Sequence, residues 1–192
     1  MSYDFSGAKP ANSFDLMPAK TQVPVIFSIQ KGDPGTPENA MKVTQTGLYQ
    51  LVLEATITEG DFASRKIWHR LTMGARPGLQ LTEGQEKAVS ISNTFIRSLL
   101  EAARGVAPTD ESAEAQAARR INSIFDLEGL ECWIEIGVEK SNDPKYDDRN
   151  TIRKIIPISA DTAGKAQAAT PPQQQRTQAP QRPAAATKPA WA

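Results

Sequence analysis

The chain has 192 residues, of which 39% are hydrophobic and 23% charged, enough apolar material for one folded domain with extensions. Basic and acidic residues number 22 each, which argues against a protein that coats duplex DNA through bulk positive charge. A single cysteine, Cys132, excludes an internal disulfide framework, and no apolar run approaches the roughly 20 residues that span a bilayer. Residues 1–10 lack the basic and apolar regions of a secretory signal, so we expect a cytoplasmic protein without a membrane segment.

Charge and composition divide the chain into three parts. Residues 1–20 predict an irregular N-terminal arm that either lies across the body or is a disordered leader. Residues 21–160 carry the patterned segments and form the expected domain. Residues 161–192, rich in Ala, Gln and Pro, predict a disordered tail. Residues 162–192 hold four basic residues and no acid, so residues 1–161 keep 18 basic and 22 acidic side chains, a net charge of −4.

The first half of the domain alternates apolar and polar residues, the pattern of half-buried strands. Residues 23–30 predict one strand, and residues 41–45 are a candidate for a brief pairing. Residues 47–74 predict a long hairpin around the turn Glu59-Gly60-Asp61. In its second arm, the residues expected toward the core are Ile67, His69 and Leu71, and those expected on the opposite face are Lys66, Trp68, Arg70 and Thr72.

The apolar period then changes to three and four residues. It predicts an amphipathic helix from about Thr82 to Arg104, with Thr82 and Gln85 as a capping box and Gly105 as the C-terminal glycine. An alanine-rich second helix is predicted over residues 113–124, stable only when packed.

The second half returns to alternation. Residues 131–139 predict a strand with Cys132 and three aliphatic residues inward and Trp133 and three glutamates outward. Residues 140–149 predict a long polar loop. Residues 150–159 predict a last strand with Ile152 and Ile156 on one face and Arg153 and Ile155 on the other.

The predicted fold class is mainly β with a helical insertion. The element order matches an OB-fold: a small, curved sheet or barrel of about five strands, with one or two helices between strands three and four. A β-sandwich would require more strands, and a parallel βαβ sheet more helices between strands.

Cationic and aromatic residues recur on the predicted outward faces and in the polar loop. Such surfaces hold single-stranded nucleic acid, because cations follow the phosphates while each base stacked on an aromatic ring contributes about 1–3 kcal/mol. The alternative is that Trp68 packs beneath the helix, as large aromatics often do, and that the cations are solvated strand edges. The candidate binding residues are Arg65, Lys66, Trp68, Arg70, Trp133, Lys145, Tyr146, Arg153 and Lys154.

Other chemistry has less support in the sequence. His69 lacks the nucleophile and the orienting partner that catalysis requires, and Cys132 lies among isoleucines as a small core side chain. One His and one Cys do not complete a zinc site. The acids of residues 131–139 and 143–148 could hold Mg²⁺, but a solvated face and a polar loop explain them better. We therefore expect no enzyme, no cofactor and no metal.

Residues 57–71, ITEGDFASRKIWHRL, resemble a group of small bacteriophage proteins. Their pattern is a strand, a turn and strand of the form G-x-[YF]-x-G-R-K-[VIL]-[FW]-x-R-[LF], a helix ending in a Leu-Leu motif before glycine, and a closing strand beginning L-x-G. Residues 99–105 and 127–130 fit the later parts. Ser64 replaces the second turn glycine, and Lys20 replaces a glycine of the family's N-terminal motif.

The resemblance implies an OB-like single-stranded DNA-binding protein of a phage DNA replication or recombination module, acting in the bacterial cytoplasm with little sequence preference. Carried over by position, Arg65, Lys66, Trp68 and Arg70 would lie on the DNA-facing strand. The tail resembles the linkers of bacterial single-stranded DNA-binding proteins, which recruit replication and recombination proteins through an acidic terminal peptide; here the end, KPAWA, is basic. The resemblance leaves a homo-oligomer open. A different class stays open too: a protein–protein adaptor for a recombinase or nuclease, which the negative body favours.

Overall fold

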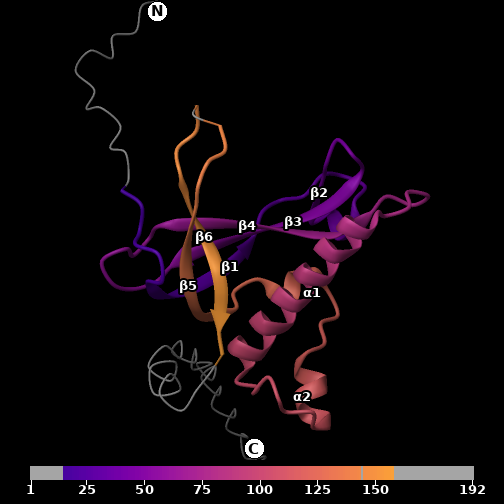
Figure 1. Ribbon diagram of the computed structural model, residues 1–192. Coiled ribbons are helices and arrows are strands. Elements are labelled where there is room, and N and C mark those ends of the chain that lie inside the picture. The colour runs from indigo at the N-terminus through magenta and orange to yellow at the C-terminus, as the bar shows by residue number, and fades with distance from the viewer. Residues whose placement is uncertain (1–14, 144, 158–192) are drawn as a thin grey trace, which may run out of the picture.

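The computed structural model describes residues 15–143 and 145–157, and these residues form a mainly antiparallel sheet of six strands with one main helix (Figure 1). The expected tail, residues 161–192, and most of the expected arm lie outside the described residues. The strands are β1 (Gln22–Ile29), β2 (Met41–Val43), β3 (Leu48–Ile57), β4 (Lys66–Ala75), β5 (Glu131–Glu139) and β6 (Arg149–Ile156).

β3 is the centre of the sheet. One of its sides pairs with β4 along nearly the whole strand, while the other pairs with β2 in its first half and with β1 in its second half. β1 continues to β5, and β5 to β6, which gives the order β2-β3-β1-β5-β6 with β4 beside β3. In Figure 1 the β5–β6 hairpin runs across the direction of β3 and β4, so the sheet is strongly coiled.

The expectation of a five-stranded sheet or barrel needs correction, because the described strands number six and the sheet stays open. The short β2 adds the extra strand at the edge of β3. β4 and β6 approach each other but share no ladder, and α1 (Glu83–Arg104) contacts both of them. The helix therefore fills part of the opening that strand pairing would otherwise close.

The main helix has the termini that the sequence predicts. The Thr82 N–H donates to Gln85 Oε1 at 2.9 Å and the Gln85 N–H donates to Thr82 Oγ1 at 3.4 Å, so the capping box is confirmed. Gly105 ends the helix at φ +71°. The second helix, α2 (Ala113–Ala118), is shorter than predicted. The Asp126 carboxylate accepts hydrogen bonds from the backbone N–H groups of residues 122 and 123, and a separate turn of 3₁₀ helix, η2 (Ile124–Leu127), begins there. Another such turn, η1 (Pro37–Asn39), precedes β2.

The alternating residues of the central hairpin form the core as predicted. Ile67 and Leu71 of β4 are buried against α1 and the interior of the sheet, together with aliphatic residues of β1, β3 and β5. Cys132 belongs to this core, and burial raises the pKa of its thiol to about 12, so it remains protonated and inert.

The last strand departs from strict alternation. Glu135 pairs with Lys154 and the next residue, Ile136, pairs with Ile152, so Arg153 is the extra residue of a β-bulge. The bulge turns both Ile152 and Ile155 inward, which corrects the predicted grouping of Ile155 with Arg153. Gly137 pairs with Thr151 next to the bulge, and a Cβ on it would lie 3.2 Å from Thr151 Cγ2 and 3.4 Å from Arg153 Cβ.

Residues 15–20, the described end of the predicted arm, lie against the body, whereas residues 1–14 lie outside the described residues. The Met17 N–H donates to Asn150 Oδ1 of β6, and Asn150 Nδ2 donates to the Met17 carbonyl, both at 2.9 Å. The Arg65 guanidinium donates to the Asp15 carbonyl at 2.7 Å. This segment thus links the beginnings of β4 and β6. No helix in the described part of the chain has the length and apolarity to cross a membrane.

Candidate nucleic-acid interface

Trp68 lies on the outward face of β4. Its neighbours Ile67 and Leu71 are buried, and strand alternation turns Trp68 the other way, leaving it 52% exposed. The alternative of a core tryptophan is therefore wrong. An indole held on a strand with half of its surface in solvent is a suitable platform for a stacked base.

Glu54 of β3 lies directly opposite Trp68. One carboxylate oxygen accepts the Trp68 indole N–H at 3.0 Å, and the other lies 2.6 Å from Lys66 Nζ. The hydrogen bond from Lys66 is the main cause that holds the pKa of Glu54 below its ordinary value, so the group is ionised at neutral pH. The carboxylate consequently neutralises Lys66 and fixes one edge of the indole.

Arg70 and Arg65 have different roles from each other. Arg70 is exposed on the same face as Trp68, and no ion-pair or hydrogen-bond partner for its side chain lies within residues 15–143 and 145–157. Arg65 precedes β4, bonds the Asp15 carbonyl and lies 5.1 Å from the centre of the Phe62 ring. Arg70 is thus the cation positioned for a ligand, whereas Arg65 holds the N-terminal segment.

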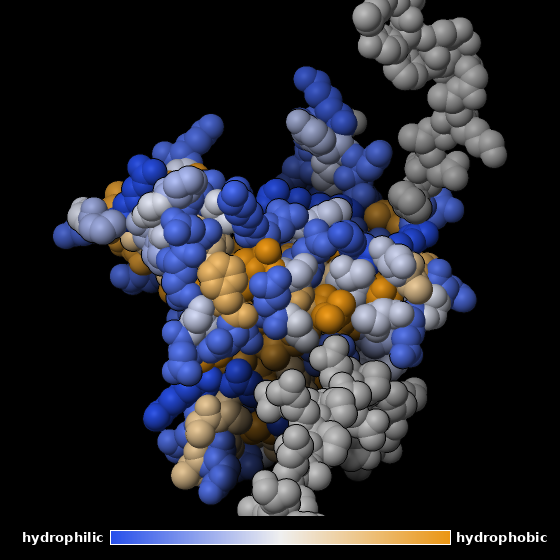
Figure 2. All heavy atoms as spheres, turned by 180° about the vertical axis from the view of Figure 1, so that it is seen from behind, coloured by the Kyte–Doolittle hydropathy of each residue, from blue (hydrophilic) through white to orange (hydrophobic). Residues whose placement is uncertain are grey.

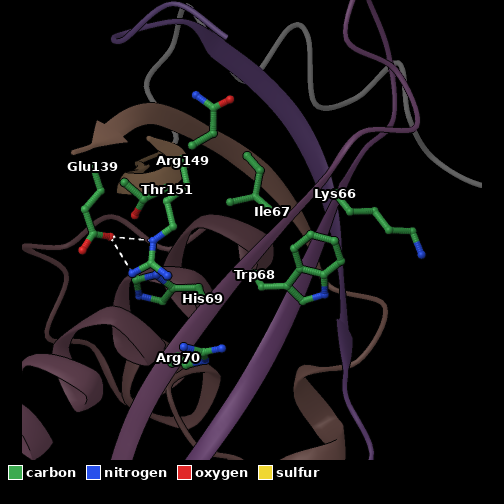
Figure 3. Close-up of a pocket in the computed structure, with 9 residues that line it drawn as sticks. Lys66, Ile67, Trp68, His69, Arg70, Glu139, Arg149 and Thr151 are labelled. Atoms are coloured by element: carbon green, nitrogen blue, oxygen red, sulfur yellow. Dashed lines mark hydrogen bonds and ion pairs between the residues drawn. The ribbon is translucent and has the colours of Figure 1, made fainter. Parts of the chain in front are cut away.

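A groove of about 450 Å³ separates β4 from the β5–β6 hairpin (Figure 3). Its β4 wall is Lys66 to Arg70, and its other wall is Glu139, Arg149, Asn150 and Thr151. His69 lies in this wall and stacks on Phe95 of α1 with ring centroids 4.3 Å apart. Burial lowers the pKa of His69, which keeps the ring neutral and fits the structural role predicted for it.

The far wall of the groove carries an ion pair. Arg149 donates from Nε and Nη2 to one oxygen of Glu139, at 3.0 and 2.9 Å. The same two residues line a second hollow of about 400 Å³ beneath the β5–β6 loop, together with Tyr146. The linings of the two hollows share Glu139 and Arg149. In Figure 3, His69 lies on the same side of β4 as these two residues, whereas the Lys66 and Trp68 side chains point to the other side.

Tyr146 and Lys145 lie at the tip of the β5–β6 hairpin. The Tyr146 side chain is 71% exposed, as a base-stacking role requires. The Lys145 N–H donates to the carboxylate of Asp143 at 3.0 Å, and Asp147 also lies beside the hollow. The loop thus offers an aromatic ring among acidic neighbours rather than a cationic patch.

Arg153 and Lys154 are held by a carboxylate. Glu135 accepts from Arg153 at 2.7 Å and lies 3.3 Å from Lys154, and only 6% of Glu135 remains exposed. Burial alone would raise the pKa of Glu135, but the two cations outweigh it and lower the pKa. The predicted solvated acidic face is therefore wrong at Glu135, because the bulge at Arg153 brings two cations over it.

Trp133 does not join the Trp68 surface. It is half-buried on β5 beside Pro24 and opposite Ile156, and both β1 and β3 lie between it and β4. The structure thus groups Lys66, Trp68 and Arg70 along β4 in the lining of the groove, while Tyr146 lines the second hollow. Trp133, Arg153 and Lys154 line neither of these two hollows.

The local sequence pattern did not indicate five residues that line the groove or contact Trp68: Glu54, Glu139, Arg149, Asn150 and Thr151. Only Glu54 had a usable signal, since it is an acid on the outward face of the strand before the cations. Figure 2 shows the molecule from the side opposite to that of Figure 1. Hydrophilic residues cover most of this side, and hydrophobic residues are visible in its middle.

Among the described residues, no three His, Cys, Asp or Glu side chains form a group that could hold a metal ion. Comparison with protein-family models, with curated proteins and with solved structures found no match.

Proposed function

We propose that this protein binds single-stranded DNA with little sequence preference. The observation that carries the proposal is Trp68, half exposed on β4 between the cations Lys66 and Arg70 and beside a groove. A stacking ring flanked by cations recognises the two features that every nucleotide shares, a flat base and a phosphate. No array of base-specific donors is needed for such binding.

The arrangement of the strands supports an OB-like architecture. Without the short β2, the order β4-β3-β1-β5-β6 and the position of α1 after β4 follow the OB-fold sequence of strands. In that fold, oligonucleotides bind on the face of strands two and three and against the loop between strands four and five. Those elements correspond here to β3, β4 and the β5–β6 loop, which carry Trp68 and Tyr146. A role in phage replication or recombination follows from the resemblance of residues 57–71 and belongs to the same proposal.

The test is fluorescence anisotropy with a labelled, unstructured oligothymidine of about 30 nucleotides at 50, 100 and 200 mM salt. We expect binding that weakens as salt rises and that quenches tryptophan fluorescence, because phosphate contacts release counterions and the indole stacks on a base. Parallel titrations with an oligouridine and with a duplex report whether the preference is for single-stranded DNA. An absence of binding at 50 mM salt would refute the proposal.

An adaptor function is the second candidate, and a specific observation favours it. Three of the predicted DNA-contacting cations, Lys66, Arg153 and Lys154, are already paired with carboxylates. A surface with its cations neutralised suits a protein partner, whose interface requires charge complementarity more than positive charge. If the oligonucleotides fail to bind, a phage recombinase or nuclease becomes the partner to test.

A further inference from the structure

Glu54 is an acid at the centre of a surface for which we propose an anionic ligand. Its carboxylate bonds the Trp68 indole at 3.0 Å and Lys66 at 2.6 Å. The Glu54 side chain is 15% exposed, whereas the Lys66 side chain is 49% exposed. The ligand would thus meet the indole and the lysine first, with the carboxylate behind them.

The two contacts of Glu54 have opposite consequences for a bound strand. The bond to the indole N–H restricts rotation of the Trp68 ring, so less entropy is lost when a base stacks on it. The ion pair with Glu54 uses one of the three N–H donors of Lys66 and offsets its positive charge, so a phosphate gains less from Lys66 than from an unpaired cation. Arg70, with no such partner among the described residues, has no corresponding cost.

We propose that Glu54 is a positioning residue that makes this surface bind nucleic acid mainly by base stacking, by holding the Trp68 ring and by offsetting the charge with which Lys66 would attract a phosphate. The inference rests on the proposed function. It assigns the phosphate contact beside Trp68 to Arg70 and makes binding less dependent on salt than the number of nearby cations would indicate.

The variant Glu54→Gln separates the two effects. Its amide oxygen still accepts the indole N–H, while its negative charge is gone and Lys66 becomes available. One additional phosphate contact steepens the slope of log K against log salt by about 0.7 for a single strand. We therefore expect the affinity for oligothymidine at 50 mM salt to be roughly three- to tenfold higher than that of the wild type. At 200 mM salt this ratio should be smaller by a factor of about 2.6. Glu114→Gln, the same charge change on the exposed face of α2, is the matched control and should leave the slope unchanged.

Two single cation variants provide a test in which Glu54 itself is unchanged. Arg70→Met should flatten the salt slope by about 0.7, and Lys66→Met should flatten it by much less. In the Lys66→Met background, Glu54→Gln should no longer raise affinity.

In the free protein, Glu54→Ala should move the NMR resonance of the Trp68 indole N–H and speed the decay of its fluorescence anisotropy, because the hydrogen bond is lost.

The outcomes separate this inference from the proposed function. If the wild-type protein binds oligothymidine and Glu54→Gln changes neither affinity nor slope, or Lys66→Met costs as much as Arg70→Met, the role of Glu54 is refuted while DNA binding stands. If the wild-type protein binds no oligonucleotide, both fall together.

Discussion

Replacement of Trp68 by alanine tests the central feature of the surface, because it should weaken ligand binding far more than it weakens the fold. A fully buried tryptophan costs about 3–5 kcal/mol when truncated to alanine. Trp68 is 52% exposed. We estimate that it keeps about 100 Å² of apolar area out of water, which at 25 cal/mol per Å² is an upper limit of about 2.5 kcal/mol. Its bond to Glu54 is at the surface and adds little.

The expected loss in the free energy of unfolding for Trp68→Ala is therefore about 1–2 kcal/mol, measured by urea denaturation followed by circular dichroism. The expected loss in affinity for oligothymidine is about 1–3 kcal/mol, or roughly 5- to 150-fold. Trp68→Phe keeps a stacking ring but has no N–H for Glu54, and should fall between the wild type and Trp68→Ala. A loss of stability above 3 kcal/mol, or an unchanged affinity, would refute the assignment of Trp68 as a stacking platform.

Three further predictions concern the scaffold. Glu101 is 4% exposed and accepts from Arg97 and Arg119 at 2.8 and 2.7 Å, so Glu101→Gln should lower the free energy of unfolding by about 2–3 kcal/mol in urea denaturation, with Glu114→Gln as the neutral control. A Cβ at Gly32 would clash with the Met41 backbone nitrogen, so Gly32→Ala should destabilise the fold by about 1–3 kcal/mol. Gly84 is in an open helical position, so Gly84→Ala should stabilise the fold by about 0.5–1 kcal/mol. Equal effects of the two variants would contradict the close packing of the β1–β2 connection. The pKa values of Glu54 and Glu101 are lowered from 4.5, so the contribution of these carboxylates to stability is complete above that pH and is lost as pH falls through the lowered values. The melting temperature should therefore stay level from pH 6 to pH 5 and decrease below about pH 4.5. A melting temperature that stays level down to pH 3 would contradict these ion pairs.

The central hairpin shows how far local pattern reaches. Alternation in residues 66–71 correctly separated the buried Ile67 and Leu71 from the outward Trp68, because a strand turns successive side chains to opposite faces wherever it lies. The capping box at Thr82 was equally predictable, since all its partners lie within one turn. Alternation failed in β6, where the bulge at Arg153 shifted the phase by one residue; a bulge depends on the partner strand, and Gly137, which accommodates it, is distant in the chain.

By itself, the sequence determined the alternation of the strands, the amphipathic helix with its two caps, and the presence of cations and aromatics on outward faces, because these depend on neighbours a few residues apart. Tertiary structure alone decided which outward residues share a surface. It placed Trp68 and Arg70 beside a groove made with β6, separated Trp133 from them by two strands, and left the sheet open between β4 and β6. It also brought a carboxylate to each group of cations: Glu54 to Lys66, and Glu135 to Arg153 and Lys154. Register and strand order bring these charges together across the sheet, and neither can be derived from the local pattern of one strand.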